Sequence, residues 1–89
     1  MIFETLKIKD LKIGIGKLVK MLRKQNNLTQ NDLAEALDLS RLTIQNLEAG
    51  KNYTIDTLLK ILQHFDLLHP LNEEITQYIA ANENIKSLY

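Results

Sequence analysis

The sequence predicts an all-α fold of five helices. Three observations predict it: apolar residues recur at intervals of three and four, hydroxyl-bearing residues stand where helices would begin, and aspartate, glycine and proline stand where helices would end. The chain has 89 residues, of which 45% are apolar, and this is enough to close one small helical core. We therefore expect a single domain with a short extension at each end.

The first helix is expected to begin near Ile15, or as early as Leu11, because Gly14 and Gly16 disfavour a helix around them. The stretch Leu6 to Lys9 alternates as a short strand does, and a strand needs another strand to pair with. An arm exchanged between the two copies of a dimer would supply that strand, and a loosely packed tail is the alternative. The chain would thus divide into an N-terminal arm, a main domain and a C-terminal helix with its tail: residues 1–11, 12–68 and 69–89.

Two short helices joined by a tight turn are predicted between residues 28 and 50. The hydroxyl group of Thr29 can cap the first of them, and Asp32, three residues later, completes a weak capping box. Asp38 lies in the turn, and Ser40 can cap the second helix, which Gly50 would end. Five apolar residues of the two helices are expected to face the core: Leu33, Ala34, Leu37, Ile44 and Leu47.

The second of these helices presents side chains suited to DNA on its outer side. An arginine can form a bidentate pair with guanine, glutamine or asparagine can do so with adenine, and leucine can contact a thymine methyl group. Short polar groups at helix ends can hold phosphates. Each residue alone is better explained as a solvated surface residue, but their joint spacing favours DNA. The expected base contacts are Arg41, Leu42, Gln45 and Asn46, and the expected phosphate contacts are Gln30, Ser40, Thr43, Lys51 and Asn52.

Nine residues fill the main positions of the family pattern "LR…LTQ.DLA…LS…I..LE.G": Arg23, Gln30, Leu33, Ala34, Ser40, Ile44, Leu47, Glu48 and Gly50. On these residues the stretch from about 15 to 67 resembles the lambda-repressor-like, or XRE-family, DNA-binding domain. The resemblance implies a five-helix domain with a helix-turn-helix as its second and third helices. It also implies that Ser40 joins the base contacts, that Gln30 holds a phosphate, and that Arg23 and Glu48 form a structural ion pair.

Two positions depart from the family pattern. Asp38 stands where the family usually has a glycine in a left-handed conformation, which aspartate tolerates at a cost of about 1 kcal/mol. Leu42 stands where many relatives carry a polar side chain that contacts a base, so contact with another protein is the alternative role for Leu42.

Positive charge is concentrated near the start of the chain. The 11 basic and 11 acidic residues cancel overall, yet the stretch Lys7 to Asn26 carries seven basic residues against Asp10 alone. Lys17, Lys20 and Lys24 recur at helical spacing, and we expect Lys20 and Lys24 to contact phosphates beside the groove. A solvated face is the alternative, and a membrane-surface role is disfavoured because the apolar side of this helix is needed in the core.

Two further helices are expected after the helix-turn-helix. Thr54 can cap a leucine-rich helix that closes the core, and Tyr53 would pack on the start of that helix rather than touch a phosphate. Pro70 should set the boundary of a last amphipathic helix that runs to about Asn82. Burial of its apolar stripe across the two-fold axis of a homodimer is favoured, and burial against its own domain is the alternative. The stripe consists of Leu71, Ile75, Tyr78 and Ile79.

Composition and motifs disfavour an enzyme, a metal protein and a membrane protein. The chain has no cysteine, and its two histidines, His64 and His69, do not have a recognised metal-ligand spacing. We expect no cofactor and no metal, because there is also no nucleophile or phosphate-loop motif. No apolar run approaches the roughly 18 residues needed to cross a membrane, and the first residues make a poor signal peptide, so a cytoplasmic location is expected.

We therefore expect a transcriptional regulator, and specifically a repressor, that binds double-stranded operator DNA as a homodimer. The alternative rests on residues 54–68, TIDTLLKILQHFDLL, which resemble the corresponding helix of HipB-like antitoxins. Such antitoxins bind DNA and also hold a toxin kinase, so the resemblance implies a partner protein beside the operator. A neighbouring gene for a HipA-like kinase would distinguish the two interpretations.

Overall fold

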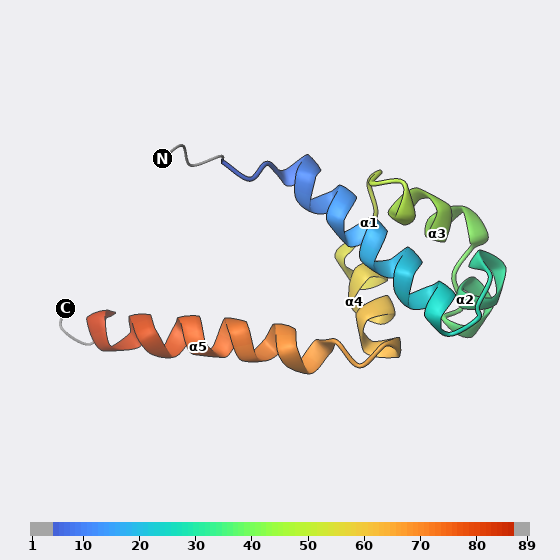
Figure 1. Cartoon of the computed structure of the whole chain (residues 1–89). Helices are drawn as coiled ribbons and strands as arrows, with labels where there is room; N and C mark the ends of the chain where they lie inside the picture. The colour runs from blue at the N-terminus through green and yellow to red at the C-terminus, as the bar shows by residue number, and fades with distance from the viewer. Residues whose placement is uncertain (1–4, 87–89) are drawn as a thin grey trace.

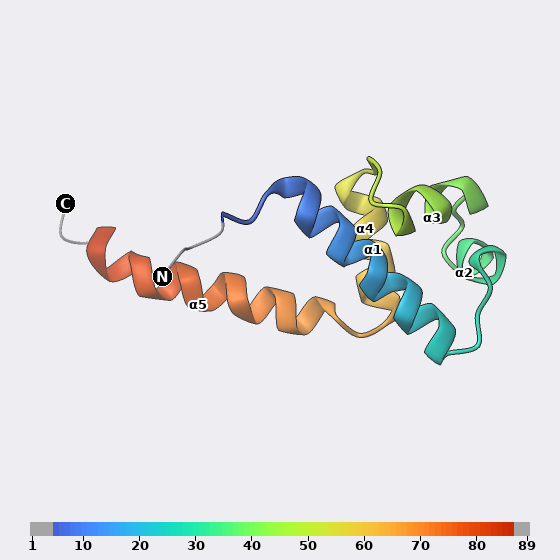
Figure 2. The same cartoon turned by 45° about the horizontal axis from the view of Figure 1, so that its top comes forward.

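The computed structural model describes residues 5–86, which form five helices and no strands (Figure 1). The prediction of an all-α fold with five helices is confirmed. The helices are α1 (Ile8–Gln25), α2 (Gln30–Ala36), α3 (Arg41–Glu48), α4 (Ile55–His64) and α5 (Leu68–Lys86). The first four pack into one body, and α5 extends away from it (Figures 1 and 2). The body carries the helix-turn-helix as α2 and α3.

Hydroxyl groups cap the helices where the sequence places them. Thr29 Oγ1 accepts the N–H of Asp32 at 3.0 Å, and Asp32 Oδ2 accepts the N–H of Thr29 at 2.8 Å, so the predicted capping box is complete. Ser40 Oγ accepts the N–H of Thr43 at 3.1 Å at the start of α3. Thr54 Oγ1 accepts the N–H of Thr57 at 3.2 Å at the start of α4. These bonds satisfy amide groups that a helix leaves without partners in its first turn.

Helices α1 to α4 are each followed by a residue in the left-handed conformation. Asn27, Asp38, Gly50 and Asp66 have positive φ, each just after α1, α2, α3 or α4. In each case the next amide bonds back to a carbonyl five residues earlier, as Leu39 N–H does to Ala34 O at 2.8 Å. This is the hydrogen bond of a Schellman ending. Asp38 thus adopts the left-handed conformation that the sequence predicts for it.

The core of the body is built from all four of its helices. Side chains of α2 and α3 meet those of α1 and α4 in one cluster, which is then enclosed by partly buried apolar residues such as Ile15, Leu28, Leu37 and Tyr53. Leu37 is therefore only half-buried, while the other four predicted core residues of α2 and α3 are fully buried. The fully buried apolar residues are Val19, Leu33, Ala34, Ile44, Leu47 and Ile61.

The N-terminal boundary differs from the expectation. Helix α1 begins at Ile8 rather than near Leu11 or Ile15, so the predicted start of the first helix and a strand through Ile8 and Lys9 are wrong. The physical reason is twofold: Asp10 Oδ2 accepts the N–H of Lys7 at 3.2 Å and so stabilises the first turn, and Gly14 costs too little to end a helix. The expected arm's residues 1–4 lie outside the described residues.

The last helix also differs from the expectation at both ends. Helix α5 begins at Leu68 and continues past Asn82 to Lys86. Pro70 lies inside its first turn, where an amide has no helical partner and a proline is tolerated, so Pro70 does not set the boundary. The radius of gyration is 16.2 Å, against about 12 Å for a compact chain of this length, because α5 projects from the body.

Candidate nucleic-acid interface

Helix α3 has a buried inner side and a more exposed outer side. Ile44 and Leu47 are fully buried, and they anchor α3 against the other helices of the body. Arg41 and Leu42 are exposed on the other side, with Leu42 at 62% exposure. Gln45 and Asn46 are half-buried. The sequence-predicted base contacts thus lie together on one short helix.

A buried ion pair holds the end of α3. Arg23 Nε donates to Glu48 Oε2 at 2.7 Å, and Arg23 Nη2 donates to Glu48 Oε1 at 3.0 Å. Arg23 Nη1 also donates to the carbonyl of Leu28 at 2.8 Å, which ties the turn between α1 and α2 to the same group. The side chains of Arg23 and Glu48 are only 9% and 5% exposed. The hydrogen bond with Glu48 raises the pKa of Arg23 above its usual range, although burial opposes this.

Gln30 takes part in the same network. Its Nε2 donates to Glu48 Oε1 at 3.2 Å, so one of the two amide hydrogens is engaged inside the protein. The second hydrogen of that amide remains available for a phosphate oxygen. Gln30 is therefore oriented by Glu48, a constraint that spacing along the sequence did not reveal.

Glycine is required where α1 crosses the end of α3. A Cβ atom added to Gly16 would lie 2.5 Å from the carbonyl oxygen of Glu48 and 2.8 Å from that of Leu47. Gly50, which follows α3 with φ of 76°, would bring a Cβ to 3.1 Å from Ile13 Cγ1. Helix α1 is thus in direct contact with the last turn of α3 and with the segment after it.

The expected phosphate contacts divide between the two ends of α3. Ser40 Oγ and Thr43 Oγ1 are 2.7 Å apart at the start of the helix, where Ser40 also forms the cap. Lys51 and Asn52 are exposed just after the helix. Both ends therefore carry exposed or half-buried polar groups that flank the outer side.

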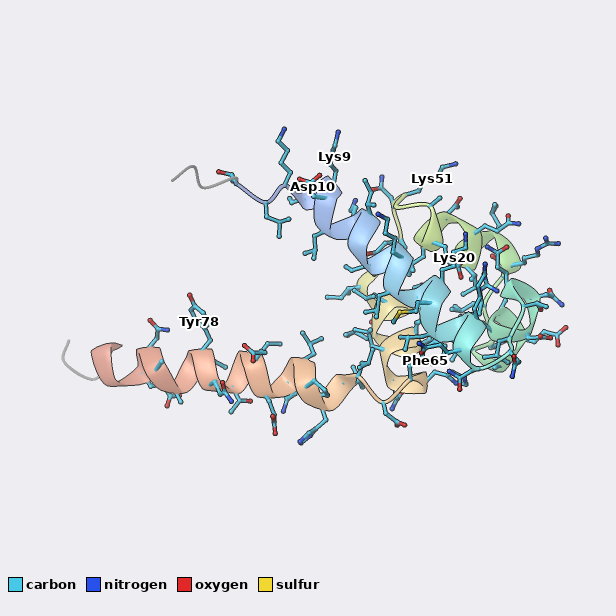
Figure 3. The ribbon with its side chains drawn as sticks, in the orientation of Figure 1. Lys9, Asp10, Lys20, Lys51, Phe65 and Tyr78 are labelled. Atoms are coloured by element: carbon cyan, nitrogen blue, oxygen red, sulfur yellow. The ribbon has the colours of Figure 1, made fainter. Side chains whose placement is uncertain are left out.

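One lysine at this site was missed by the sequence reasoning. Lys12 Nζ donates to Asn52 Oδ1, which joins the first half of α1 to the segment after α3. The two residues are 40 positions apart, so only the fold brings them together. The run of lysines that begins at Lys7 was the available signal, but spacing could not say which of them would approach α3. Lys20, which was predicted, projects from α1 toward the side that carries α3 (Figure 3).

A basic hollow of about 700 Å³ lies where the end of α1, the start of α2 and the start of α3 meet. Lys24 and Arg41 contribute positive groups beside Arg23, which is paired with Glu48, and Asn27, Gln30 and Asn31 contribute amides. Arg41 therefore lies at the edge of the outer side of α3, beside Lys24, and can reach either a phosphate in the hollow or a base beyond it. Sequence spacing alone placed Arg41 with the base contacts.

The remaining candidate residues lie elsewhere. Tyr53 packs half-buried against the core, and burial raises the pKa of its hydroxyl group above the usual range. His69 Nε2 lies 3.0 Å from Glu73 Oε1 on the exposed surface of α5. Within residues 5–86 no cluster of three histidine, aspartate or glutamate residues is arranged to hold a metal ion. In the same part of the chain no helix is both long and apolar enough to span a membrane.

Comparison with known proteins gives one family and several relatives. A family model described as helix-turn-helix matches residues 19–70. Antitoxin HipB of Escherichia coli K12 is 37% identical over 54 residues, which cover 60% of this chain and 61% of HipB. A second antitoxin HipB, from E. coli O6:H1, is 35% identical over 54 residues, which cover 60% of this chain and 57% of the relative.

A third relative is much longer than this chain. It is named "Putative HTH-type transcriptional regulatory protein", comes from Methanocella arvoryzae, and is 39% identical over 51 residues. The matched residues cover 57% of this chain and 16% of that protein. The chain therefore spans about three fifths of the length of the two HipB relatives and a smaller part of the third.

Proposed function

We propose that this chain, which belongs to the helix-turn-helix family, is a transcriptional regulator that binds a specific DNA sequence. The observation that carries the proposal is the outer side of α3: Arg41 and Leu42 are exposed there, while the inner side and the end of α3 are fixed by Ile44, Leu47 and the Arg23–Glu48 pair. A rigid helix with a free polar side is what insertion into the major groove requires. Repression of transcription is the expected consequence of occupying an operator.

The geometry supports a division of roles along α3. Leu42, Gln45 and Asn46 would contact base edges from the outer side, with Ser40 at the start of the helix. Lys20, Lys24, Gln30 and Thr43 would contact phosphates on one flank, and Lys51, Asn52 and the newly found Lys12 on the other. Arg41 would contact a guanine, and its place beside Lys24 makes a phosphate the competing partner.

Homodimerisation completes the proposal. The apolar stripe of α5, Leu71, Ile75, Tyr78 and Ile79, is between 38% and 76% exposed. A stripe of this size exposed to water favours association with another apolar surface. Two copies related by a two-fold axis would present two α3 helices to half-sites about 34 Å apart.

Selection of binding sites from random duplex DNA tests this function. The expected result is an enriched palindrome whose half-sites are one helical turn apart. No enrichment from a folded protein would contradict sequence-specific binding and would direct attention to a protein partner. The Asn46→Ala variant, selected in parallel, should lose preference at one position in each half-site.

A role as an antitoxin is the second candidate, and the identity to HipB over 54 residues favours it. Under this reading the chain would bind operator DNA and also a toxin, and the exposed Leu42 and α5 stripe would be available to that partner. Co-expression with the product of a neighbouring kinase-like gene would test it. Formation of a stable complex and relief of growth arrest are expected, and growth arrest that persists would remove the antitoxin role.

A further inference from the structure

Two exposed apolar surfaces lie outside the core of this protein. The first is the start of α1, where Ile8 is 77% exposed and Leu11 is 53% exposed. The second is the stripe of α5 that includes Ile75 and Ile79. Both lie outside or at the edge of residues 19–70, the stretch that the helix-turn-helix family model covers. The part of the chain shared with the family therefore does not account for either surface.

The exposed start of α1 continues a stripe that is buried further along the helix. Ile8, Leu11, Ile15 and Leu18 follow one another at intervals of three and four, so they share one side of α1. Ile15 packs against the core and Leu18 is half-buried, whereas Ile8 and Leu11 are exposed. Lys12 and Ile13 of the same two turns meet the segment after α3, so only the side that carries Ile8 and Leu11 remains open within the described part of the chain.

Helix α5 of the same chain is held away from this surface. Asp66, with φ of 60°, ends α4, and the N–H of Leu67 bonds to Leu62 O at 2.8 Å. Leu68 begins α5 directly afterwards, so a short hydrogen-bonded turn fixes the direction in which α5 leaves the body. Helix α5 and the start of α1 point to the same side of the molecule but remain apart in both views (Figures 1 and 2), and Tyr78 projects from α5 into the intervening space (Figure 3).

The two surfaces are complementary in charge as well as in apolarity. Glu74 and Glu83 lie beside Ile75, Tyr78 and Ile79 on the exposed side of α5. Lys7 and Lys12 lie at the start of α1 beside this stripe, whereas Lys9 projects away from α5 (Figure 3), and Asp10 is the one acidic residue among residues 7–12. An apolar stripe bordered by glutamates and an apolar stripe bordered by lysines fit each other better than either fits a copy of itself.

We propose that a second copy of this chain fills the space, with α5 of each copy seated against the first two turns of α1 of the other. This inference rests on the homodimer of the proposed function and names its contact. A two-fold axis generates both contacts at once, so each copy buries both of its exposed surfaces. The chain would thus exchange α5 between the copies of the dimer.

The proposed contact adjoins the segment that positions α3. Lys12, next to Leu11, donates to Asn52, and Ile13 contacts Gly50. Docking of the partner's α5 would therefore fix the same part of α1 that supports the end of α3. The dimer contact would set the separation of the two α3 helices and with it the spacing of the half-sites.

Chemical cross-linking tests the inference directly. The chain has no cysteine of its own, so an introduced cysteine is the one thiol that reacts in each variant. The variants Leu11→Cys and Ile75→Cys change exposed side chains, so both should fold as judged by circular dichroism. Mixed in equal amounts, exchanged at low concentration and treated with a short bismaleimide, they should give a covalent pair that contains one chain of each variant. Glu35→Cys, an exposed position on α2, mixed with Ile75→Cys is the matched control and should give little of that product.

Four results would overturn the inference. Efficient linkage of Ile75→Cys to itself without linkage to Leu11→Cys would show that the α5 helices pair with each other. An internally linked single chain from the Leu11→Cys, Ile75→Cys double variant would show that α5 folds back on its own α1. A monomeric mass by light scattering at micromolar concentration would remove the homodimer as well, whereas a dimer that fails to cross-link would remove only the exchange of α5. DNA binding is measured separately and is not part of this test.

Discussion

In the body formed by α1–α4 the apolar faces of the helices cover one another, whereas the apolar residues of α5 between Leu71 and Ile79 are exposed. The two regions also differ in their ion pairs. Arg23 and Glu48 are almost fully buried in the body, while His69 and Glu73 on α5 are 81% and 57% exposed. The body is therefore specified by contacts within one chain, whereas no side chain of α5 that the structure describes joins the core cluster.

The largest effect is expected from breaking the buried ion pair. Glu48→Ala leaves the guanidinium group of Arg23 buried without its carboxylate, and should lower the free energy of unfolding by about 3 to 5 kcal/mol. Glu73→Ala on α5 removes an exposed pair and should change the same quantity by less than about 1 kcal/mol. Urea denaturation of both variants measures the difference. Similar losses from the two changes would contradict the contrast between body and α5.

Apolar side chains should show the same contrast. Leu47→Ala removes a fully buried side chain of α3 and should cost about 2 to 5 kcal/mol of stability. The double change Ile75→Asp and Ile79→Asp affects half-exposed residues of α5, and should leave each chain folded while abolishing the dimer. Light scattering gives the mass and circular dichroism gives the fold. An unchanged mass would show that α5 does not form the dimer contact.

Two glycines of α1 provide a matched pair inside the body. Gly16→Ala places a methyl group against the carbonyl oxygens of Leu47 and Glu48 and should cost about 1 to 3 kcal/mol. Gly14→Ala meets nothing within 4 Å and should stabilise the helix by about 0.5 to 1 kcal/mol. Thermal unfolding of the two variants decides the sign. A stabilising Gly16→Ala would show that α1 does not approach α3 so closely.

Two substitutions in the body should distinguish a residue that contacts a base from a residue that contacts a phosphate. Arg41→Ala should weaken binding to a preferred site by about 1 to 3 kcal/mol and blur its preference. Lys20→Ala should weaken binding to all sequences alike and reduce the salt dependence. Equal losses on specific and random duplexes for Arg41→Ala would assign Arg41 to the phosphate in the hollow beside Lys24. The Lys60→Ala variant, an exposed lysine of α4, is the charge control.

The smallest effect is expected from the capping box of α2. Hydrogen bonds from the backbone and hydroxyl group of Thr29 lower the pKa of Asp32 in the folded state. A depressed folded pKa contributes stability that is present above the unfolded pKa near 3.8 and is lost as the pH falls through the folded value. Asp32→Asn should therefore reduce stability slightly at neutral pH and flatten its decline in acid. Stability is measured for both proteins as the pH is lowered. Identical curves of stability against pH would contradict this role of Asp32.

Local rules explain which parts of the fold were predictable from the sequence. Thr29, Ser40 and Thr54 each cap the helix that follows, because a cap depends on groups within three residues. The predicted starts of α1 and α5 were wrong because glycine and proline do not end these helices. A glycine is needed at position 16 because α3 lies against α1 there, and Pro70 lies in the first turn of α5, where a proline destabilises a helix least.

Contacts between distant residues explain what the sequence could not predict. Lys12 and Asn52 meet because α1 crosses the end of α3, and Gln30 is oriented by Glu48 because the start of α2 lies beside the end of α3. The Arg23–Glu48 pair, also distant in sequence, was predicted only because the chain resembles a known family. The place of Arg41 at the edge of a hollow depends on how α1, α2 and α3 converge, which no spacing records.

Titration of a selected duplex beside a scrambled duplex, at two salt concentrations, tests whether α3 recognises a DNA sequence. The selected duplex should be bound at least about 10³ times more tightly than the scrambled one, and this ratio should persist at the higher salt concentration. Weak, salt-sensitive binding shared equally by both duplexes would contradict the claim that the outer side of α3 recognises a DNA sequence.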